Sequence, residues 1–471
     1  MEIKENSAVI EKYRALTFGE QPEVILERPC KMDDGIIHHA DFEKNKFRFI
    51  FSSSEQEITF FIPASGSGSR MFNFLYDFLD NPTEESRGNT EKFLNSISDF
   101  AFFELLPYAL KKKVKNYDVN LDEFISYLLK SSGLGLGDLP KGLIPFHRSR
   151  SFILNAFQEQ LLQGLRVKDD DISFHFTINK EYEGKIKDAL LAIQHLTGRR
   201  CNITWSEQNI STNSIAFDDS QQVVYANNEE ILTRPSGHGA LLNNLDAINS
   251  DIIFIKNIDN VQHEIYSQDS IDLFKYLGGL LIEFKKELKA AYLSDNQRDE
   301  LTMLNERYQF ISPDMSFINM SKDQLDAIVL RPIRICGMVK NEGQPGGGPF
   351  WVNEGGIISK QIVEKAQINN KGEQYKIMVQ SQYFNPVLMA VSTTDIFGNK
   401  LSLTNFSDPN KYFKVEKTHL NKTIHFIELP GLWNGSMANW TSVFVDAPST
   451  AFTPVKTVLD LLTNAHTESK P

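Results

Sequence analysis

The chain has 471 residues, of which 41% are hydrophobic and 23% charged, a balance that is typical of globular proteins and excludes an intrinsically disordered chain. One compact core seldom organises so many residues, so we expect a main domain with a large appendage, or two domains. The formal net charge is −12 and the sequence has no long Lys/Arg tract, which argues against nucleic acid or an anionic membrane as the main partner.

Targeting and cysteine signals point to a cytoplasmic protein. The N-terminal segment contains acidic residues and no continuous apolar region, so we expect neither a signal peptide nor export. The apolar stretch 276–284 is far shorter than the roughly 20 residues that a membrane-spanning helix needs. Cys30, Cys201 and Cys336 are widely spaced, which suggests neither a disulfide framework nor a zinc site.

In chain order, residues 1–57 form an N-terminal extension, and the first clear element is a buried strand over 58–63. The strand ends at a proline and opens into a glycine-rich loop, and a helix over 71–79 follows. Apolar residues then recur at intervals of three and four residues over about 84–135, which predicts a helical insertion.

Strands and helices alternate in the next part of the chain, and alternation of this kind predicts a mainly parallel sheet wrapped by helices. We expect strands over 172–178, 202–208, 221–226 and 251–259, and helices over 152–165, 182–196, 240–248 and 272–293. The apolar strand at 251–259 should lie in the centre of the sheet, buried on both faces. We therefore take residues 58–330 as an α/β core.

The last part of the chain, residues 331–471, has a different composition. It is rich in Gly, Pro and β-branched residues, which predicts strands and long loops that complete the core. A helix over 454–465 is expected near the end.

The glycine loop after the first strand is a candidate phosphate site. Glycines allow a phosphate to approach the backbone closely, while hydroxyl groups and an arginine add donors and charge. The residues concerned are Ser65, Gly66, Ser67, Gly68, Ser69 and Arg70. A flexible loop uses the same residue types, so this reading stays open for the motif alone. A nucleotide-binding P-loop is excluded, because no G-K-[ST] follows at the required spacing.

The order of strand, glycine loop, arginine and helix resembles the G-x-G-[ST]-R-M signature of the sugar nucleotidyltransferases. The companion Pro-Lys motif of that family resembles LPKGLIPFH at 139–147, with Lys141 at the lysine position. About 70 residues separate the two motifs here, and such an insertion is tolerable because the entropy of loop closure grows only logarithmically with length. The resemblance implies a Rossmann-like nucleotide-diphospho-sugar transferase core and catalytic roles for Arg70 and Lys141.

Two further segments resemble the UDP-sugar pyrophosphorylase branch of that family. RPSGHGALLNNL at 234–245 resembles the loop at the nucleobase, which assigns nucleotide contacts to Gly237, His238 and Gly239. Gln208 matches a glutamine of the family that either faces the base or fixes the loop. NIDN at 257–260 resembles the place of an acidic residue near the phosphates and Mg²⁺, which makes Asp259 the metal ligand. Asp-Asn after a strand is also common turn chemistry, and that alternative stays open.

Three C-terminal segments match the sugar side of the same family. IVEKAQI at 362–368 resembles a strand whose glutamate binds sugar hydroxyls, here Glu364. LWNGSMANW at 432–440 resembles a segment that lines the sugar site, which implies contacts from Asn434, Gly435 and Asn439. FTPVKTV at 452–458 resembles a motif whose lysine contacts the sugar phosphate, and Lys456 is the matching residue.

One string lies outside these matches. RPIRICGMVKNEGQPGGGPFWV at 331–352, together with the LWNGSMANW segment, resembles a bacterial family described as domain of unknown function 4301, and we expect membership. Its glycine-rich loop at 341–349 can be neither helix nor interior strand. It is either a structural turn or another anion-accepting backbone.

These resemblances together imply an enzyme that condenses a UTP-like nucleoside triphosphate with a sugar 1-phosphate, releases pyrophosphate and uses Mg²⁺. Two alternatives remain. A glycosyltransferase of the same core fold would consume a nucleotide sugar, although the one D-x-D string, Asp169–Asp171, precedes a strand instead of ending one. A non-catalytic nucleotide-sugar binding or regulatory protein would keep the pocket without turnover.

Overall fold

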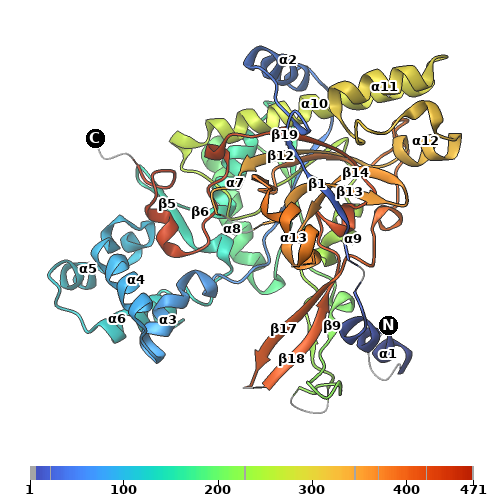
Figure 1. The fold of residues 1–471 in the computed structure, drawn as a ribbon. Coiled ribbons are helices and arrows are strands. Elements are labelled where there is room, and N and C mark those ends of the chain that lie inside the picture. The colour runs from blue at the N-terminus through green and yellow to red at the C-terminus, as the bar shows by residue number, and fades with distance from the viewer. Residues whose placement is uncertain are drawn as a thin grey trace. The chain divides into compact units, whose positions relative to one another are not determined.

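A computed structural model describes residues 7–21, 23–226, 230–343, 346–369, 371–420 and 422–468 (Figure 1). The chain divides into two compact units. Unit 1 comprises Met1–Glu57, Gln208–Phe254 and Lys275–Ala447, and unit 2 comprises Ile58–Glu207, Ile255–Phe274 and Pro448–Pro471.

Unit 2 is built on three parallel strands in the order β4 (Ile58–Pro63), β7 (Ile172–Thr177) and β8 (Asn202–Ser206). The strands are joined by the helices α7 (Ala156–Leu165) and α8 (Glu183–Thr197), which pack on each other. Aromatic rings fill the face of the sheet, and Phe60 and Phe174 stack with their centroids 5.4 Å apart. The parallel arrangement that the alternating pattern predicts is confirmed for these strands.

The helix expected over 152–165 begins later than the sequence suggests. Residues Phe152–Asn155 form strand β6, which pairs with β5 (Pro145–Ser149) as an antiparallel hairpin. The helix starts at Ala156 because the Asn155 side chain accepts a hydrogen bond from the Gln158 amide, 3.1 Å away, and the Gln158 side chain accepts one from the Asn155 amide at 3.0 Å.

The predicted helical insertion is confirmed, and it belongs to unit 2. Figure 1 shows its short helices gathered in one group, in blue tones. The insertion comprises α4 (Glu84–Asn95), α5 (Tyr108–Lys115) and α6 (Leu121–Leu129). The helix expected over 71–79 is α3 (Asn73–Asp80), which packs on α4. The group has an aromatic core of its own, in which the ring centroids of Phe93 and Phe100 lie 5.0 Å apart and those of Phe100 and Phe102 lie 5.1 Å apart.

Unit 1 contains a mixed sheet. Its strand order is β2 (Lys31–Met32), β3 (Gly35–Ile37), β19 (Thr441–Asp446), β12 (Ile333–Lys340), β16 (Met389–Ser392) and β11 (Ile252–Ile255). The pairs β2–β3, β3–β19 and β19–β12 are parallel, whereas β12–β16 is antiparallel. β11 is buried along its whole length, as expected for a central strand.

The β-rich C-terminal region supplies β12, β16 and β19 to the mixed sheet and also contributes to two smaller antiparallel groups. The first is a sheet of β1 (Leu26–Pro29), β13 (Gly348–Glu354) and β14 (Ile357–Val363). The second is the hairpin of β17 (Phe413–His419) and β18 (Lys422–Glu428). The fold is therefore mixed α/β with mostly parallel pairing in its main sheet, a helical insertion and a β-rich C-terminal region, as predicted.

The helices of unit 1 lie mainly in its N-terminal segment and after β11. They are α1 (Ser7–Phe18), α2 (Asp41–Ser52), α9 (Leu242–Asp246), α10 (Gln268–Leu293), α11 (Gln297–Tyr308), α12 (Lys322–Val329) and α13 (Gly372–Val379), with α10 beginning in unit 2. Among the described residues, no helix combines the length and apolarity that a membrane crossing requires.

Two expected elements differ from the structure. Residues 221–226 form isolated bridges instead of a strand, because the chain reverses at Gln221, whose φ is 60°, and pairing lasts for one residue at a time. The helix expected over 454–465 is reduced to the 3-10 turn Val458–Leu462, since Pro454 is engaged in a bridge with Asn260.

The close packing of α2 on α10 gives a stability prediction. A Cβ at Gly279 would lie 1.8 Å from the Phe47 carbonyl oxygen, so Gly279→Ala should lower the free energy of unfolding by roughly 1–3 kcal/mol. This loss should outweigh the helix preference of alanine, about 1 kcal/mol. Thermal or denaturant unfolding measures it. The matched control is Gly184→Ala in α8, where a Cβ meets nothing within 4 Å and stability should hold or rise.

Candidate functional site

The glycine loop leaves β4 at Pro63 and runs into the 3-10 turn Ser69–Phe72. A Cβ at Gly68 would lie 2.5 Å from Ile144 Cδ1, so packing requires glycine there. A Cβ at Gly66 would meet no protein atom within 4 Å, so the backbone at Gly66 faces open space. The two glycines of the motif therefore serve different purposes.

The loop was expected to offer its amides to a phosphate, and two of them are already engaged within the protein. The Gly68 amide donates to the Leu139 carbonyl at 3.0 Å, and the Ser69 amide donates to Ser67 Oγ at 3.2 Å. Ser65, Gly66 and Ser67 are exposed. The amides of Gly66 and Ser67 are thus the part of the loop that remains open to an anion, as judged within the described chain.

Lys141 lies directly beside this loop. Its amide donates to the Gly66 carbonyl at 3.0 Å, and Ser67 and Pro140 form an antiparallel bridge. The two motifs that the helical insertion separates in sequence are thus adjacent in space. The Lys141 ammonium donates to Asp259 Oδ2 at 2.6 Å, and both side chains are largely buried, at 17% and 18% exposed.

Asp259 lies in a turn four residues beyond the end of β11 at Ile255, instead of at the end of a longer strand as expected. Its carbonyl accepts from the Val455 amide at 3.1 Å, and the neighbouring Asn260 and Pro454 form a bridge. The segment that precedes Lys456 is therefore fixed to the Asp259 turn. Lys456 itself is exposed, and its amide donates to Asp460 Oδ2 at 2.7 Å.

Arg70 is exposed at the start of the 3-10 turn. Within the described part of the chain, no hydrogen bond or ion pair holds its side chain. Unit 2 thus brings the glycine loop, Lys141, Asp259 and the Lys456 segment together, and it leaves the guanidinium of Arg70 available.

The carboxylate of Asp259 can be compared with the ligands that Mg²⁺ requires. Asp259 offers one carboxylate, and the described residues contain no group of three or more His, Cys, Asp or Glu that could enclose an ion. Mg²⁺ is usually held by one or two carboxylates together with substrate phosphates and water. Asp259 fits such a substrate-bridged ion and does not fit a structural metal cage.

In unit 1, the loop matched to the nucleobase packs against the segment that follows β18. A Cβ at Gly237, whose φ is 69°, would lie 2.7 Å from Glu428 Oε2, and one at Gly239 would lie 2.1 Å from the Pro430 carbonyl oxygen. Both glycines are therefore required by packing, whether or not a base binds there.

His238 joins the same two segments. Its Nδ1 accepts from the Leu432 amide at 2.8 Å, and its ring stacks on Trp433 with a centroid distance of 4.0 Å. Burial lowers the pKa of His238 to about 4, so the ring is neutral at physiological pH.

The residues matched to the sugar site meet this loop. Asn434 Nδ2 lies 3.4 Å from Glu364 Oε1, and a Cβ at the neighbouring Gly431 would contact both Asn434 and His238. Burial, and then the charge of Glu428, raise the pKa of Glu364. Unit 1 therefore gathers Gly237, His238, Gly239, Glu364, Asn434 and Gly435 around one short stretch of chain.

Two further predicted residues make no hydrogen bond to that cluster within the described part of the chain. The Asn439 amide donates to the Phe406 carbonyl at 3.1 Å. Gln208 lies at the start of a unit 1 segment, and its buried Nε2 has no hydrogen-bond partner among the described residues.

The glycine loop at 341–349 also reaches the Glu364 region. A Cβ at Gly347 would lie 3.7 Å from Glu364 Cγ, and the Gly347 carbonyl accepts from the Asn385 amide at 2.9 Å. The reading of this loop as a turn between strands agrees with its position before β13. Gln344 and Pro345 lie outside the described residues.

Sequence reasoning missed two buried cations beside the Asn434 segment. Arg334 is fully buried and donates to the Trp433 carbonyl at 2.6 Å and to Ser442 Oγ at 2.8 Å. Burial, and then the charge of Arg334, lower the pKa of Lys411 to about 8. No motif signals Arg334, because it lies within the apolar strand β12.

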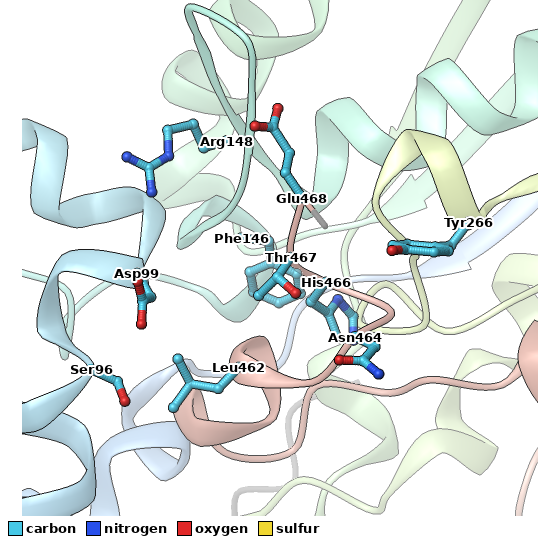
Figure 2. A pocket seen from close by; sticks show the side chains of 10 residues that line it. All are labelled: Ser96, Asp99, Phe146, Arg148, Tyr266, Leu462, Asn464, His466, Thr467 and Glu468. Atoms are coloured by element: carbon cyan, nitrogen blue, oxygen red, sulfur yellow. The ribbon is translucent and has the colours of Figure 1, made fainter. Parts of the chain in front are cut away.

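A separate cavity of about 730 Å³ opens in unit 2, and Figure 2 shows the side chains that line it. Ser96 and Asp99 of the insertion contribute to its wall, as do Phe146 and Arg148 of β5 and His466 near the C-terminus. Phe146 belongs to the 139–147 motif, but none of the individual site residues predicted from the sequence lines this cavity.

Comparisons with known proteins give a family and several similar structures. The model of the family described as Domain of unknown function (DUF4301) matches residues 2–467. A putative UDP-N-acetylglucosamine pyrophosphorylase from Entamoeba histolytica is similar with 13% identity and a TM-score of 0.46, over 88% of this chain and 80% of that chain. Comparison with curated proteins gives no significant match.

Two other solved structures are similar to the chain. A UDP-glucose phosphorylase from Trypanosoma brucei has 12% identity and a TM-score of 0.43, over 98% of this chain and 75% of that chain. An apo UDP-glucose pyrophosphorylase has 11% identity and a TM-score of 0.34, over 86% of this chain and 96% of that chain.

The two glycines of the loop should respond differently to the same substitution. Gly68→Ala should lower the free energy of unfolding by roughly 1–3 kcal/mol, because Ile144 and the Leu139 carbonyl block a Cβ. Gly66→Ala should stay within about 0.5 kcal/mol of the wild type, since the added methyl meets no protein atom. Thermal unfolding of both variants is the measurement, and equal destabilisation would contradict the division of roles.

Proposed function

The chain belongs to the family described as Domain of unknown function (DUF4301), and we propose that this member is a sugar-1-phosphate nucleotidyltransferase. It would join a UTP-like nucleoside triphosphate to a sugar 1-phosphate and release pyrophosphate. The observation that carries the proposal is the convergence of the Gly66 loop, Lys141 and Asp259, with the Lys141 ammonium 2.6 Å from Asp259 and its amide bonded to Gly66.

The reaction needs positioned charge instead of a protein nucleophile. A phosphate oxygen of the sugar 1-phosphate attacks the α-phosphorus, the bond to the β-phosphate oxygen breaks, and pyrophosphate leaves with the bonding electrons. Negative charge grows on the α-phosphate and on the leaving group. Lys141 and Arg70 are cations suited to stabilise it, and the Gly66 and Ser67 amides can donate to phosphate oxygens.

Asp259 holds Lys141 in place before substrate binds, and its second carboxylate oxygen remains for a divalent ion. Asp259 would hold Mg²⁺ together with the triphosphate, and the bound ion would supply charge neutralisation on the phosphates. Lys456, exposed on the segment fixed to the Asp259 turn, would meet the incoming sugar phosphate.

Unit 1 supplies groups that suit a sugar and a base. Glu364 and Asn434 offer an acceptor and an amide side by side, which is the combination that binds sugar hydroxyls. The neutral His238 stacked on Trp433 provides a flat, apolar surface with polar edges. The backbone around Gly237 and Gly239 is the candidate reader of the base edge.

Pyrophosphate exchange tests the proposal directly. Labelled pyrophosphate should enter the nucleoside triphosphate in the presence of the matching nucleotide sugar, Mg²⁺ and the wild-type protein. Binding of nucleotide sugars without exchange would instead favour a binding protein, and transfer of the sugar to an acceptor would favour a glycosyltransferase.

Lys141→Ala should reduce the exchange rate by roughly 10²–10³-fold, because it removes a cation aimed at developing charge. The matched control is Lys187→Ala in α8, where the lysine pairs with Glu183 on an exposed helix face, and exchange should be retained. Circular dichroism and thermal unfolding confirm that both variants are folded. Wild-type exchange in a folded Lys141→Ala protein would remove Lys141 from the mechanism.

Arg70→Lys should also reduce exchange, since a single ammonium does not reproduce the forked donors of a guanidinium on pyrophosphate oxygens. The KM for pyrophosphate should rise more than the KM for the nucleotide sugar. Steady-state kinetics with each substrate varied in turn separates the two. A variant with wild-type constants would show that Arg70 contacts no substrate.

A further inference from the structure

Helix α7 carries polar side chains on a face that is completely buried. Glu159, Gln160 and Gln163 are between 1% and 4% exposed, although a buried helix face is normally apolar. Gln160 Nε2 donates to the carbonyls of Asn257 at 2.8 Å and Ile258 at 3.2 Å. The helix therefore fixes the two residues that lead into Asp259.

The third polar residue, Gln163, binds the chain on the other side of Asp259. Its Nε2 donates to the Gln262 carbonyl at 2.8 Å, and its Oε1 accepts from the Lys256 ammonium at 2.9 Å. The turn from Lys256 to Gln262 is thus held at both ends by one helix.

Glu159 begins a hydrogen-bonded chain that runs to another segment. Glu159 Oε1 lies 2.6 Å from His147 Nδ1, His147 Nε2 lies 2.8 Å from His466 Nδ1, and His466 Nε2 lies 3.0 Å from the Thr453 carbonyl. His147 and His466 are 0% and 4% exposed. Figure 2 shows His466 beside Phe146, on the chain that leads to the C-terminus.

The chain has one consistent arrangement of protons when its rings are neutral. The Thr453 carbonyl can only accept, so His466 Nε2 carries a proton and His466 Nδ1 accepts from His147 Nε2. His147 Nδ1 then accepts from a protonated Glu159. Burial supports this state, because it raises the pKa of Glu159 to about 8 and lowers the pKa of His147 to about 3.

Thr453 stands at the start of the segment that carries Lys456. Its amide donates to Asn260 Oδ1 at 2.9 Å, its hydroxyl accepts from Gln262 Nε2 at 2.9 Å, and Val455 donates to the Asp259 carbonyl. Every one of these contacts joins the segment to the turn that α7 holds.

We propose that His466 is a positioning residue: it holds the Thr453 carbonyl, and the chain from Glu159 through His147 thereby sets Lys456 in register with Asp259. This inference rests on the proposed function for the role of Lys456, while the positioning itself is a structural statement. Because a misplacement of about 1 Å can cost on the order of 10²-fold in rate, loss of this anchor should reduce turnover without changing any group that touches substrate.

Two substitutions at His466 separate its two hydrogen bonds. A Gln side chain reaches as far as Nε2 and keeps the donor to the Thr453 carbonyl, whereas an Asn side chain reaches only as far as Nδ1 and keeps the acceptor for His147. We expect His466→Asn to lower kcat by roughly 10- to 100-fold and to raise the KM for the sugar phosphate, while His466→Gln retains most of the turnover. His175→Asn is the matched control, since His175 is another buried histidine with two hydrogen-bond partners, Thr204 and Ser206.

Amide hydrogen exchange provides a readout that does not depend on activity. Residues 453–457 should lose protection in His466→Asn and keep it in His466→Gln and His175→Asn. Equal protection of this segment in the Asn and Gln variants would overturn the positioning role. Equal turnover of the two variants would also overturn it, provided that the wild-type protein shows pyrophosphate exchange. If the Asn variant does not fold, the Gln variant decides: wild-type protection and turnover support the inference, and loss of either overturns it. A wild-type protein without pyrophosphate exchange would overturn the proposed function alone.

Discussion

The contact between Lys141 and Asp259 is the interaction that joins the parts of the candidate site in unit 2. It joins the end of the helical insertion to the turn after β11, and the Lys141 amide ties the same point to the Gly66 loop. An isolated buried charge is costly, so each member of the pair needs the other while no ligand is bound. A bound polyphosphate would offer Lys141 a second anion, and the Lys141 ammonium would then share its interaction between Asp259 and the phosphates.

The sequence was informative where short motifs follow regular elements. The strand at 58–63, the glycine loop and the insertion follow from apolar patterning, and the proximity of Lys141 and Asp259 agrees with the rule that ligands bind beyond the carboxyl ends of parallel strands. The first and last residues of the helices and strands were harder to predict. The start of α7 depends on the Asn155 cap and on the pairing of β6 with β5, neither of which changes the apolar spacing.

Other parts of the candidate site could not be found from sequence. His147 and His466 are far apart in the chain, and no spacing rule links two single histidines to Glu159. Arg334 is hidden inside an apolar strand. Gly237 and Gly239 illustrate the opposite problem, because their motif suggests ligand contact while their packing on Glu428 and Pro430 already explains the glycines. A short motif does not reveal whether a glycine is required for ligand contact or for packing.

The helical insertion separates two segments that meet in the folded chain, and this separation affects the order in which they fold. The bridge between Ser67 and Pro140 joins parts of the chain that are far apart in sequence. Such a contact forms slowly, because closing the loop between them costs conformational entropy before the contact is made. The helices α3 to α6 between them make contacts that are local in sequence and enclose their own aromatic cluster. If they form early, they shorten the effective loop and deliver Leu139 to Gly68 already aligned. The insertion would then act as an internal folding aid, and Lys141 would reach its place only after those helices have collapsed.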